Sequence, residues 1–212
     1  MVEQRKLTRA EQKALRPAQI LAAAFEEFVS NGYAAARVED IADRVGVTKG
    51  TVYVYFETKE LLFEEMIRDS SRSFRDIALK ARELEGSPLD RLVALIQVVY
   101  QQLFDDRQSR EIMRLVISEG PKFPEIVKRH ERDFIDPVIA EVDALLSEGV
   151  KAGLFHPQRA GFAELILAPV LTATVIRLIL GDRFDLQRED YIRAHIDLLL
   201  NGLQVSPSGK VH

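Results

Sequence analysis

Apolar residues recur with helical spacing along most of the chain. Near the N-terminus they form one stripe, typical of a first helix: Ile20, Leu21, Ala24, Phe25, Phe28 and Val29. Pro17 suits the first turn of this helix, and Asn31-Gly32 suits its C-terminal cap. A second helix is predicted over 38–45, and a short third helix after Gly46. No run of alternating apolar and polar residues indicates a strand, so the pattern predicts an all-α fold.

The later helices are longer and are separated by glycine and proline. Thr58-Lys59 begins a helix that is predicted to run without a break over 58–84, with an apolar stripe of Phe63, Ile67, Phe74, Ile77, Ala81 and Leu84. Gly86-Ser87-Pro88 ends it, with Ser87 as the N-cap of the next helix. Further helices are predicted at about 88–104, 107–119, 124–152, 158–180 and 187–204. Pro137 and Pro169 are expected to kink two of these.

Composition narrows the class of protein. The chain has 212 residues, of which 47% are hydrophobic and 29% are charged, and it contains no cysteine. That absence excludes disulfide scaffolds, a cysteine nucleophile and Cys-ligated metals, and it fits a reducing cytoplasm. Residues 1–16 are charged and no apolar segment follows them, so no secretory signal is predicted. The longest apolar run, 165–180, is shorter than the ~20 residues of a membrane span, and a soluble, cytoplasmic protein without a membrane partner is expected.

Charge is unevenly distributed. The net charge is −4, which argues against a general nucleic-acid binder. Residues 1–16 have a net charge of +3, because they carry five basic residues against Glu3 and Glu11: Arg5, Lys6, Arg9, Lys13 and Arg16. The remaining residues therefore sum to −7, and the chain is a short basic arm on an acidic body.

Residues 38–59, VEDIADRVGVTKGTVYVYFETK, have the pattern of a helix-turn-helix. Ala42 is small where two helices cross closely, and Gly46 takes the tight turn, where a positive φ is cheapest for glycine. The residues predicted to point inward are Ile41, Val45, Val47 and Val52. Thr48 caps the third helix, whose exposed N-terminal end enters the major groove in this motif. An ordinary αα-corner in a helical protein is the alternative.

The match extends beyond this motif, and the chain resembles the TetR family of bacterial repressors. The residues that carry the resemblance follow the apolar first helix and are Asn31-Gly32-Tyr33, Glu39-Asp40-Ile41-Ala42, Gly46-Val47-Thr48-Lys49-Gly50-Thr51-Val52-Tyr53, Tyr55-Phe56 and Lys59-Glu60-Leu61. They cover about 50 contiguous residues with the family's spacing. The remainder matches in its helix order, and the stretch SEGPKFPE at 118–125 looks like the AefR-like subset.

The resemblance implies a homodimer that binds a double-stranded DNA operator through one three-helix head per subunit. It places residues 49–51 and Tyr53 at base edges, with Tyr55 and Lys59 at phosphates, and Thr48 is also a predicted DNA-binding residue. The residue chemistry agrees, because Lys49 is a donor suited to guanine and Thr51 offers a hydroxyl or a methyl group. Gly50 lets the backbone approach DNA closely, and Lys59 opens the next helix, where a phosphate is favoured.

Two positions depart from the family pattern. Arg37 stands where the family often has a Ser or Thr that caps the second helix, so this cap is not expected; Arg37 itself is a candidate phosphate contact. Glu39 stands where some members have a basic residue that reads bases. Base readout is therefore expected from the third helix and the arm.

The body is expected to carry dimerisation and an effector pocket. The helices at 158–180 and 187–204 are apolar on more than one face, as in helices buried against both a core and a partner. The predicted dimer interface is Ile192, His195, Ile196, Leu199 and Leu203, with Leu198 and Leu200 outside this stripe. A purely intramolecular core is the alternative.

Aromatic and apolar positions on the middle helices are candidate pocket residues: Tyr100, Phe104, Met113, Ile117, Phe134, Val138, Phe162 and Ile166. Many such positions serve only as core. Arg114 lies among apolar residues and is a candidate contact for an anionic ligand, or else the partner of a carboxylate such as Glu119.

Catalytic chemistry finds little support in the sequence. The four histidines, His130, His156, His195 and His212, lack the spacing of metal ligands, and His195 is interpreted as a hydrogen-bonded interface residue. The acidic pairs Glu26-Glu27, Glu64-Glu65 and Asp105-Asp106 diverge around a helix and are interpreted as solvated faces. No enzyme activity, cofactor or metal site is predicted.

The sequence thus predicts four segments: a basic arm (1–16), a helix-turn-helix domain (17–60), a helical ligand-binding and dimerisation domain (61–204) and a disordered tail (205–212). The predicted function is a ligand-responsive repressor, released by a small, largely apolar effector that moves the heads through the helix at 58–84. A DNA binder of the same fold controlled by a protein partner is the alternative. An enzyme or a carrier of apolar metabolites ranks third.

Overall fold

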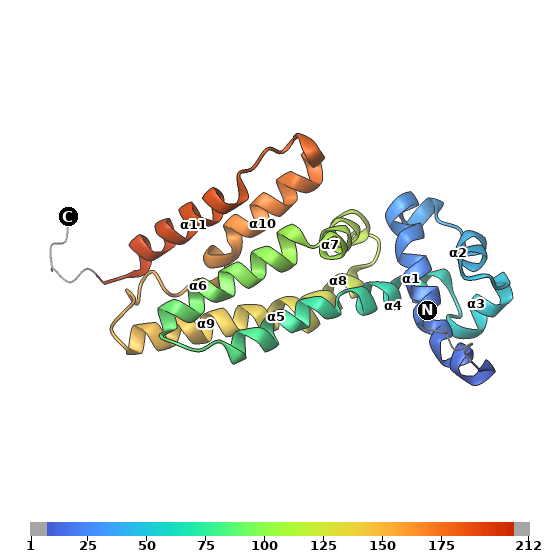
Figure 1. Cartoon of the computed structure of the whole chain (residues 1–212), viewed down its shortest axis with the longest axis horizontal. Coiled ribbons are helices and arrows are strands. Elements are labelled where there is room, and N and C mark those ends of the chain that lie inside the picture. Colours follow the sequence, from blue (N-terminus) through green and yellow to red (C-terminus); the bar gives the residue numbers. More distant parts are fainter. Residues whose placement is uncertain (1–7, 206–212) are drawn as a thin grey trace, which may run out of the picture. The chain divides into compact units, whose positions relative to one another are not determined.

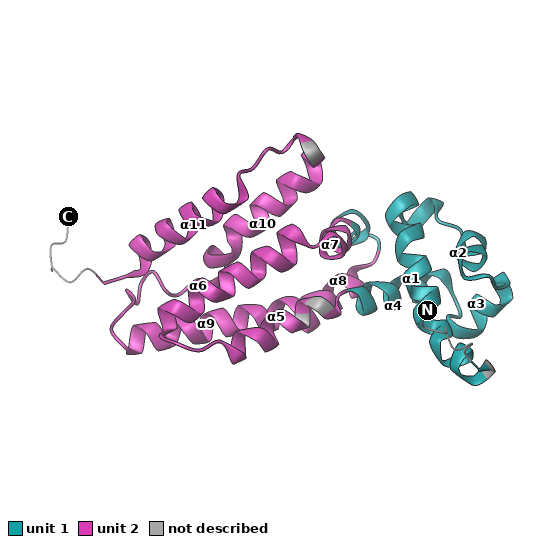
Figure 2. Ribbon diagram, in the orientation of Figure 1, with its two compact units in different colours: residues 1–70, 115–122 teal, residues 71–114, 123–212 magenta. Residues whose placement is uncertain are grey.

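The computed structural model describes residues 8–205, except for the side chains of Arg9, Ser73, Arg75 and Asp182. Residues 1–7 of the predicted arm and 206–212 of the predicted tail lie outside this range. Within it, the secondary structure is helical apart from one isolated bridge between Phe155 and Gln204, so the all-α prediction is confirmed (Figure 1). The chain divides into two compact units (Figure 2). The N-terminal unit comprises Met1–Ser70 and Leu115–Lys122, and the C-terminal unit comprises Ser71–Arg114 and Phe123–His212.

Helix α1 (Arg9–Ala35) begins earlier than the sequence pattern predicts. Thr8 Oγ1 accepts a hydrogen bond from Glu11 N at 3.2 Å, and the Glu11 carboxylate accepts one from Thr8 N at 2.7 Å. This capping box fixes the start of the helix. Pro17 therefore lies inside α1, and the prediction that it occupies the first turn is wrong. The spacing of Thr8 and Glu11 was the signal for the true start.

The turns of the N-terminal unit follow the predictions. Gly32 has φ +70° and interrupts α1 at the predicted cap, and Gly46 has φ +72° at the end of α2 (Val38–Val45). Thr48 Oγ1 accepts a hydrogen bond from Thr51 N at 3.2 Å and so caps α3 (Lys49–Tyr55). Helix α4 (Lys59–Ser70) packs on α1, which also packs on α2. The buried core between these helices includes Ile20, Ala24, Phe28, Ile41, Ala42, Val52, Phe63 and Met66.

The predicted continuous helix over 58–84 is wrong. Helix α4 ends at Ser70, and α5 (Arg72–Glu83) begins after Ser71, whose ψ of 3° departs from helical geometry. Ser71 is fully buried, and its Oγ lies 3.3 Å from Nδ1 of His130. Serine side chains compete with the helical backbone for hydrogen bonds, and paired small polar residues are a recognised cause of helix breaks. The break coincides with the boundary between the two units.

The C-terminal unit contains the remaining helices. Helix α6 (Pro88–Val99) has the predicted Ser87 cap, closed by Asp90, and continues as the π-helix η1 (Tyr100–Asp105). Helix α7 (Arg107–Glu119) matches its predicted bounds and contributes its last residues to the N-terminal unit. The predicted 124–152 helix consists of α8 (Pro124–His130), the π-helix η2 (Glu131–Ile135) and α9 (Asp136–Lys151), so its irregularity falls directly before Pro137. Helix α10 (Ala163–Leu180) runs through Pro169, and the short η3 (Gly181–Arg183) leads to α11 (Arg188–Leu203).

Helix α9 lies centrally in this unit, since it packs against α5, α6 and α10, and α11 packs on α6. A close approach at Gly149 brings α9 against the buried Phe155, where a Cβ atom would lie 2.1 Å from the phenylalanine ring. Helix α10 is long and apolar enough to cross a membrane by length and composition alone, a test that core helices of soluble proteins also pass. About 33% of it is buried within this chain, so much of its apolar surface is open to a further contact.

Candidate DNA-binding surface and effector-domain sites

The first turn of α3 is exposed, as the sequence predicts. Thr48, Lys49 and Gly50 are exposed, whereas Thr51, Tyr53 and Tyr55 are half-buried. The adjacent Val52 is fully buried and fastens the helix to the core. Val54, which the sequence reasoning missed, is 80% exposed. Its position two residues after the inward-facing Val52 was the available signal, because such residues point to opposite sides of a helix.

Lys49 is not free in this conformation. Its Nζ atom lies 2.8 Å from Oε1 of Glu39 on α2 and 5.6 Å from the centroid of the Tyr53 ring. The hydrogen bond lowers the pKa of Glu39 and raises the pKa of Lys49, so both groups are charged at neutral pH. Glu39, the residue that departs from the family pattern, is thus in contact with Lys49, the predicted base reader.

The Arg37 side chain makes no cap on α2, as expected. The buried carboxylate of Glu27 instead accepts from the backbone N–H of the N-cap residue, Arg37, at 3.4 Å and from Asn31 Nδ2 at 2.7 Å. Arg44 completes the cluster with an ion pair at 3.4 Å. Glu27 is 2% exposed, so the interpretation of the Glu26-Glu27 pair as a solvated face is wrong for Glu27. Its role is to join α1 to α2.

Lys59 is also engaged within the N-terminal unit. Its Nζ donates to the backbone oxygen of Ala34 at 3.3 Å and lies 4.7 Å from the centroid of the Tyr33 ring. Tyr33 donates from its hydroxyl to Glu60 at 2.8 Å, and burial together with this hydrogen bond raises the pKa of Tyr33. Lys59 thereby closes the last turn of α1, and its predicted phosphate contact stays a prediction.

The segment Leu115–Lys122 reaches the same end of α1. Glu119, which is 8% exposed, accepts a hydrogen bond from Tyr33 N at 3.4 Å and from Lys122 Nζ at 2.9 Å. Arg114 pairs with a nearby carboxylate, as one interpretation of the sequence suggests, and this carboxylate is Glu111, at 2.8 Å. The kink of α1 and the end of α7 are therefore hydrogen-bonded to one another.

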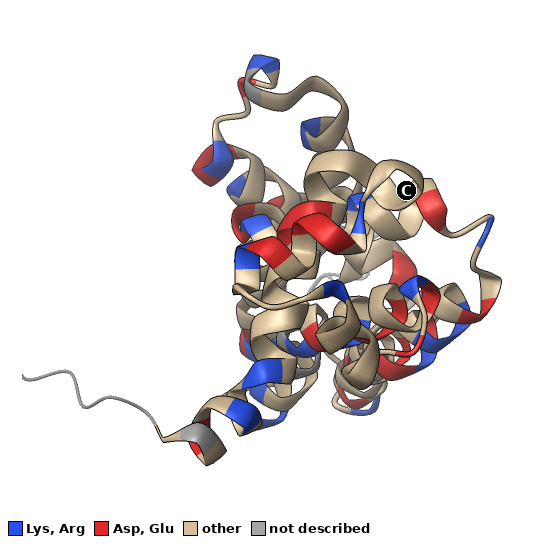
Figure 3. Ribbon diagram, turned by 90° about the vertical axis from the view of Figure 1, so that its right-hand side faces the viewer, with Lys and Arg blue, Asp and Glu red and all other residues tan. Residues whose placement is uncertain are grey.

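Basic and acidic residues are interspersed over the helices (Figure 3), in keeping with the modest net charge. Of the predicted basic arm, Lys13 is exposed, and Arg16 donates from Nη1 to the backbone oxygen of Val45 at 3.3 Å. Arg16 thus satisfies a carbonyl at the C-terminal end of α2.

The predicted pocket residues divide into three groups. Those buried in the C-terminal unit are Tyr100, Phe104, Phe134, Val138 and Ile166. Met113 and Arg114 are half-buried. Ile117 and Phe162 are 57% and 58% exposed, so these two side chains point largely toward solvent. Their assignment to a pocket stays a prediction.

A groove of about 880 Å³ lies between α6 and α11. Its apolar lining residues are Leu84, Ala94, Val98, Ile192, Ile196 and Leu200, and its polar ones are Gln97, Gln101, Asp105, Arg188, Glu189, Arg193 and Asp197. Ile192 and Ile196, predicted to contact a second subunit, thus face this groove. A smaller hollow of about 400 Å³ between α10 and α11 is lined by Leu165, His195, Leu198 and their neighbours.

His195 is hydrogen-bonded, as predicted. Its Nδ1 lies 3.0 Å from the hydroxyl of Tyr100, and burial lowers its pKa. His130 is buried between Phe74 and Phe134, and burial lowers its pKa to about 4. No group of three His, Asp or Glu side chains suited to a metal ion occurs among the described residues.

The predicted dimer residues Ile192, His195 and Leu203 are at most 8% exposed within one chain, and Ile196 and Leu199 are half-buried. The apolar side chains that α10 and α11 do expose are not among these predicted residues. They are, with their exposed fractions, Leu165 (64%), Leu171 (40%), Ile179 (70%), Leu180 (40%) and Leu198 (75%). Leu198 was set outside the predicted stripe, yet it is the most exposed apolar residue of α11.

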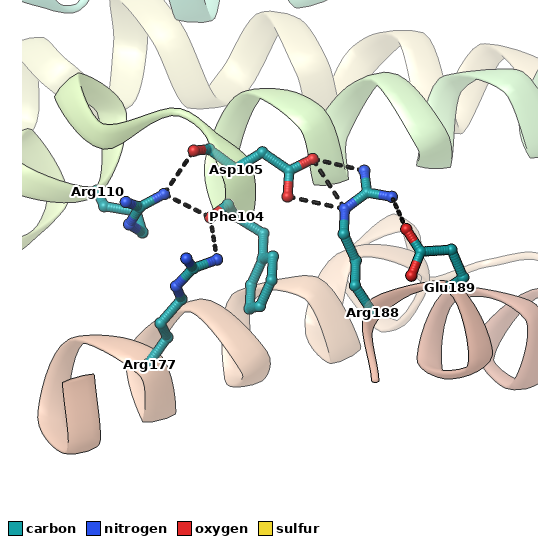
Figure 4. A network of polar contacts seen from close by, with 6 residues as sticks. All are labelled: Phe104, Asp105, Arg110, Arg177, Arg188 and Glu189. Atoms are coloured by element: carbon teal, nitrogen blue, oxygen red, sulfur yellow. Dashed lines mark hydrogen bonds and ion pairs between the residues drawn. The ribbon is translucent and has the colours of Figure 1, made fainter. Parts of the chain in front are cut away.

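Polar contacts surround the end of η1 (Figure 4). The Asp105 carboxylate receives two hydrogen bonds from Arg188 Nε, at 2.8 and 2.9 Å. Asp106 accepts from Ser109 N at 2.7 Å and caps α7. Asp105 is exposed and Asp106 half-buried, and the two carboxylates turn to different partners, in line with the interpretation that this pair diverges around a helix.

Comparisons with known proteins agree with this architecture. Residues 20–66 match the model of bacterial regulatory proteins of the tetR family, and residues 92–200 match the C-terminal domain of AefR-like transcriptional repressors. The fatty acid metabolism regulator protein of Bacillus subtilis is 25% identical over 201 residues, which are 91% of this chain and 97% of that protein. The repressor KstR2 of Mycolicibacterium smegmatis is 27% identical over 153 residues, 69% of this chain and 70% of that protein.

Solved structures show the same fold. A transcriptional regulator from Saccharomonospora viridis in complex with choline has a TM-score of 0.75 at 21% identity, covering 91% of this chain and 99% of that one. FadR from Bacillus subtilis in complex with stearoyl-CoA has a TM-score of 0.64 at 20% identity, covering 87% and 98%. The chain belongs to the TetR family of bacterial regulatory proteins, which are DNA-binding transcriptional regulators, and it is a repressor with an AefR-like C-terminal domain.

Proposed function

We propose that this protein is a cytoplasmic homodimer that represses transcription from a pseudo-palindromic operator and is released by a small, largely apolar effector. The observation that carries the proposal is the exposed first turn of α3, capped by Thr48 and anchored by the buried Val52. A helix presented in this way fits the major groove with its N-terminal residues at base edges.

The residues of this surface have distinct proposed roles. Lys49 donates to guanine, Thr51 and Val54 contact a thymine methyl group, and Gly50 lets the backbone approach closely. Thr48, Arg37, Tyr53, Tyr55 and Lys59 are assigned in this proposal to the sugar-phosphate backbone or neighbouring base edges, where they would orient the head.

The exposed apolar side chains of α10 and α11 support the dimer. Leu165 and Leu198 line one hollow and are 64% and 75% exposed in the single chain. Contiguous exposed apolar surface on a soluble protein marks an interaction site, and a two-fold interface places the same helices of both subunits together. Leu199, half-buried beside them, contributes to the same contact.

The relatives support a small-molecule effector. One solved relative holds choline and another holds stearoyl-CoA, so the fold accommodates chemically different ligands. In this chain the groove between α6 and α11 offers apolar surface to such a ligand. The six apolar residues of its lining favour a ligand with a substantial apolar part.

Release requires that effector binding and DNA binding favour different conformations. The chain passes between its two units at Ser70–Ser71, Arg114–Leu115 and Lys122–Phe123. Because the helix predicted over 58–84 is broken at Ser71, it cannot act as one rigid rod. We propose that effector binding changes the chain at these three crossings, with Ser71 as the hinge and with Glu119 transmitting the change to α1 through its hydrogen bond with Tyr33 N. A 100-fold loss of DNA affinity takes about 2.7 kcal/mol of coupling between the two sites.

Selection of bound sequences from random DNA tests the function. The full-length protein should enrich a pseudo-palindrome whose half-sites are about one helical turn apart, and Lys49→Ala should relax preference at one position of each half-site. A true effector should bind more weakly to the operator complex than to the free dimer, by the factor that it weakens DNA binding. Failure to enrich any sequence would overturn the proposal.

Control by a protein partner is the second candidate. The exposed apolar face of α10, including Phe162 and Ile179, favours it if that face stays open in the dimer. Sedimentation equilibrium of the purified protein distinguishes the small-molecule effector from the protein partner. A stable dimer that covers this face leaves no apolar surface there for a partner.

A further inference from the structure

Two arginine side chains converge on one backbone oxygen at the end of η1. Arg110 donates from Nη1 to the oxygen of Phe104 at 2.6 Å and to that of Asp105 at 2.7 Å. Arg177, from α10, donates from its own Nη1 to the same Phe104 oxygen at 3.2 Å. Its guanidinium also lies 4.6 Å from the centroid of the Phe104 ring (Figure 4). Two positive charges thus share one neutral acceptor.

The carboxylates nearest to this pair are engaged elsewhere. Asp105 is bound by Arg188, Asp106 accepts from Ser109 N, and Glu111 accepts from Arg114. Among the described residues, no carboxylate makes a hydrogen bond or an ion pair with Arg110 or Arg177. The two guanidinium groups are half-buried, so their charges are only partly screened by water.

The electrostatics of Arg110 reflect this arrangement. Burial lowers its pKa, and the charge of Arg177 lowers it further, while Asp106, Glu111 and Asp105 act in the opposite direction from a distance. Arginine stays charged in proteins, so the repulsion is relieved by a counter-charge rather than by loss of a proton. A guanidinium group has five N–H donors in a planar fork that matches a carboxylate or a phosphate, and each of these two uses one nitrogen in the bonds above.

We propose that Arg110 and Arg177 form an oxyanion subsite, which takes the carboxylate or phosphate group of a ligand. Asp105 and Arg188 line one end of the groove between α6 and α11, and Arg110 binds the backbone oxygen of that same Asp105. An amphiphile whose anionic end sits at the arginine pair therefore has apolar surface close by. The subsite rests on the proposed function only in identifying this ligand with the effector; anion binding itself needs no DNA.

Titration of the full-length protein with inorganic phosphate and, separately, with octanoate tests the subsite. Ionic strength is fixed with chloride, octan-1-ol serves as the uncharged control, and thermal unfolding and calorimetry report binding. At least one of the two anions should bind saturably, and octan-1-ol should bind independently of the arginines. Phosphate binding would show that the subsite reads the anion alone, and binding of octanoate only would show that it needs the apolar tail. If neither anion binds the wild-type protein saturably, the proposal is wrong.

Variants separate this role from simple packing. Arg177→Gln and Arg110→Gln should each weaken anion binding at least tenfold, and Arg177→Lys should rescue it in part because the charge remains while the fork is lost. Arg183→Gln, at an exposed arginine whose Nε donates to the Leu180 oxygen, is the matched control and should bind like wild type. Equal binding by wild type and both Gln variants would overturn the subsite. Operator binding, measured in the same samples, reports separately on the proposed function.

Discussion

The ammonium group of Lys49 lies 2.8 Å from the carboxylate of Glu39, so the predicted base reader of α3 is paired with an acidic residue of α2. Both side chains are nearly half exposed, and an exposed pair of this kind contributes little to stability. DNA brings phosphates and guanine acceptors that compete with Glu39 for the same ammonium group. The pair therefore acts on DNA affinity more than on folding.

Glu39→Gln is expected to strengthen binding to all DNA sequences several-fold, because it removes a negative charge near the phosphates and frees Lys49. The gain should be largest at low salt. Fluorescence anisotropy with the selected operator and a scrambled duplex, over a range of salt concentrations, measures it. Glu83→Gln on α5 makes the same charge change at an exposed carboxylate of the C-terminal unit. Equal affinities for the two variants would show that the Lys49–Glu39 pair does not limit DNA binding.

Glu27→Ala should destabilise the protein by about 2–4 kcal/mol, because it leaves the Arg37 N–H, Asn31 and Arg44 without their shared buried acceptor. Glu27→Gln keeps one acceptor oxygen and should cost less. Urea unfolding gives both values, with Glu57→Ala at an exposed position as control. A change in Glu27→Ala no greater than in the control would refute the role of Glu27 in joining α1 to α2.

His130 should make stability fall as the solution is acidified. Its pKa is lowered to about 4 by burial, against an ordinary value of 6.5, so the unfolded chain binds a proton at a pH where the folded chain does not. The stability is fully present above pH 6.5 and is lost as pH falls toward 4, by about 2 kcal/mol between pH 7 and pH 5. Denaturant unfolding of wild type and His130→Gln at both pH values isolates the contribution of His130 to the pH dependence of stability. An equal pH dependence in the two proteins would contradict the assignment.

Gly149→Ala should destabilise the C-terminal unit by about 1–3 kcal/mol, because the new methyl group would overlap the buried Phe155 ring. Gly202→Ala is the matched control, since a Cβ atom there has no neighbour within 4 Å and alanine favours a helix more than glycine does. Thermal unfolding should thus move in opposite directions for the two variants. A shift of the same sign and size in both would mean that Phe155 repacks freely.

Leu198→Arg should convert the dimer to monomer, because it places a charge at the most exposed apolar position of α11. Leu79→Arg on α5, at a leucine that is 55% exposed, should leave the dimer intact. Sedimentation velocity distinguishes the species. Dimers in both variants would place the interface away from Leu198.

The helix-turn-helix was predictable from the sequence because its geometry depends on local residues. Gly46 at positive φ and Thr48 as the cap of α3 are consequences of short-range backbone sterics and hydrogen bonding, which a sequence displays directly. The break at Ser71 was not predictable in this way. The Ser70-Ser71 pair is visible in the sequence, but the partner of Ser71, His130, is 59 positions away and meets it only in the folded chain.

Burial of charge was equally hidden from the pattern. Glu27 and its neighbour Glu26 look alike in a helical stripe, yet Glu27 is buried because α2 brings Arg37 and Arg44 against it. The arginine pair at η1 also joins residues from distant helices, and no spacing in the sequence connects Arg110 with Arg177. Sequence periodicity gives the face of a helix, whereas tertiary contacts decide which polar group on that face finds a partner.

The hydrogen bond between Tyr33 and Glu119 bears on how regulators of this kind can be recombined. A chimaera that joins the first 70 residues of one protein to the rest of another takes the Leu115–Lys122 segment from the second parent. That segment must then fit the first parent's α1, where a Cβ atom at position 32 would stand 3.6 Å from the Glu119 carboxylate. An exchange of the N-terminal unit between two regulators therefore has to include the segment Leu115–Lys122. A single junction after residue 70 would build this compact unit from the sequences of two different proteins.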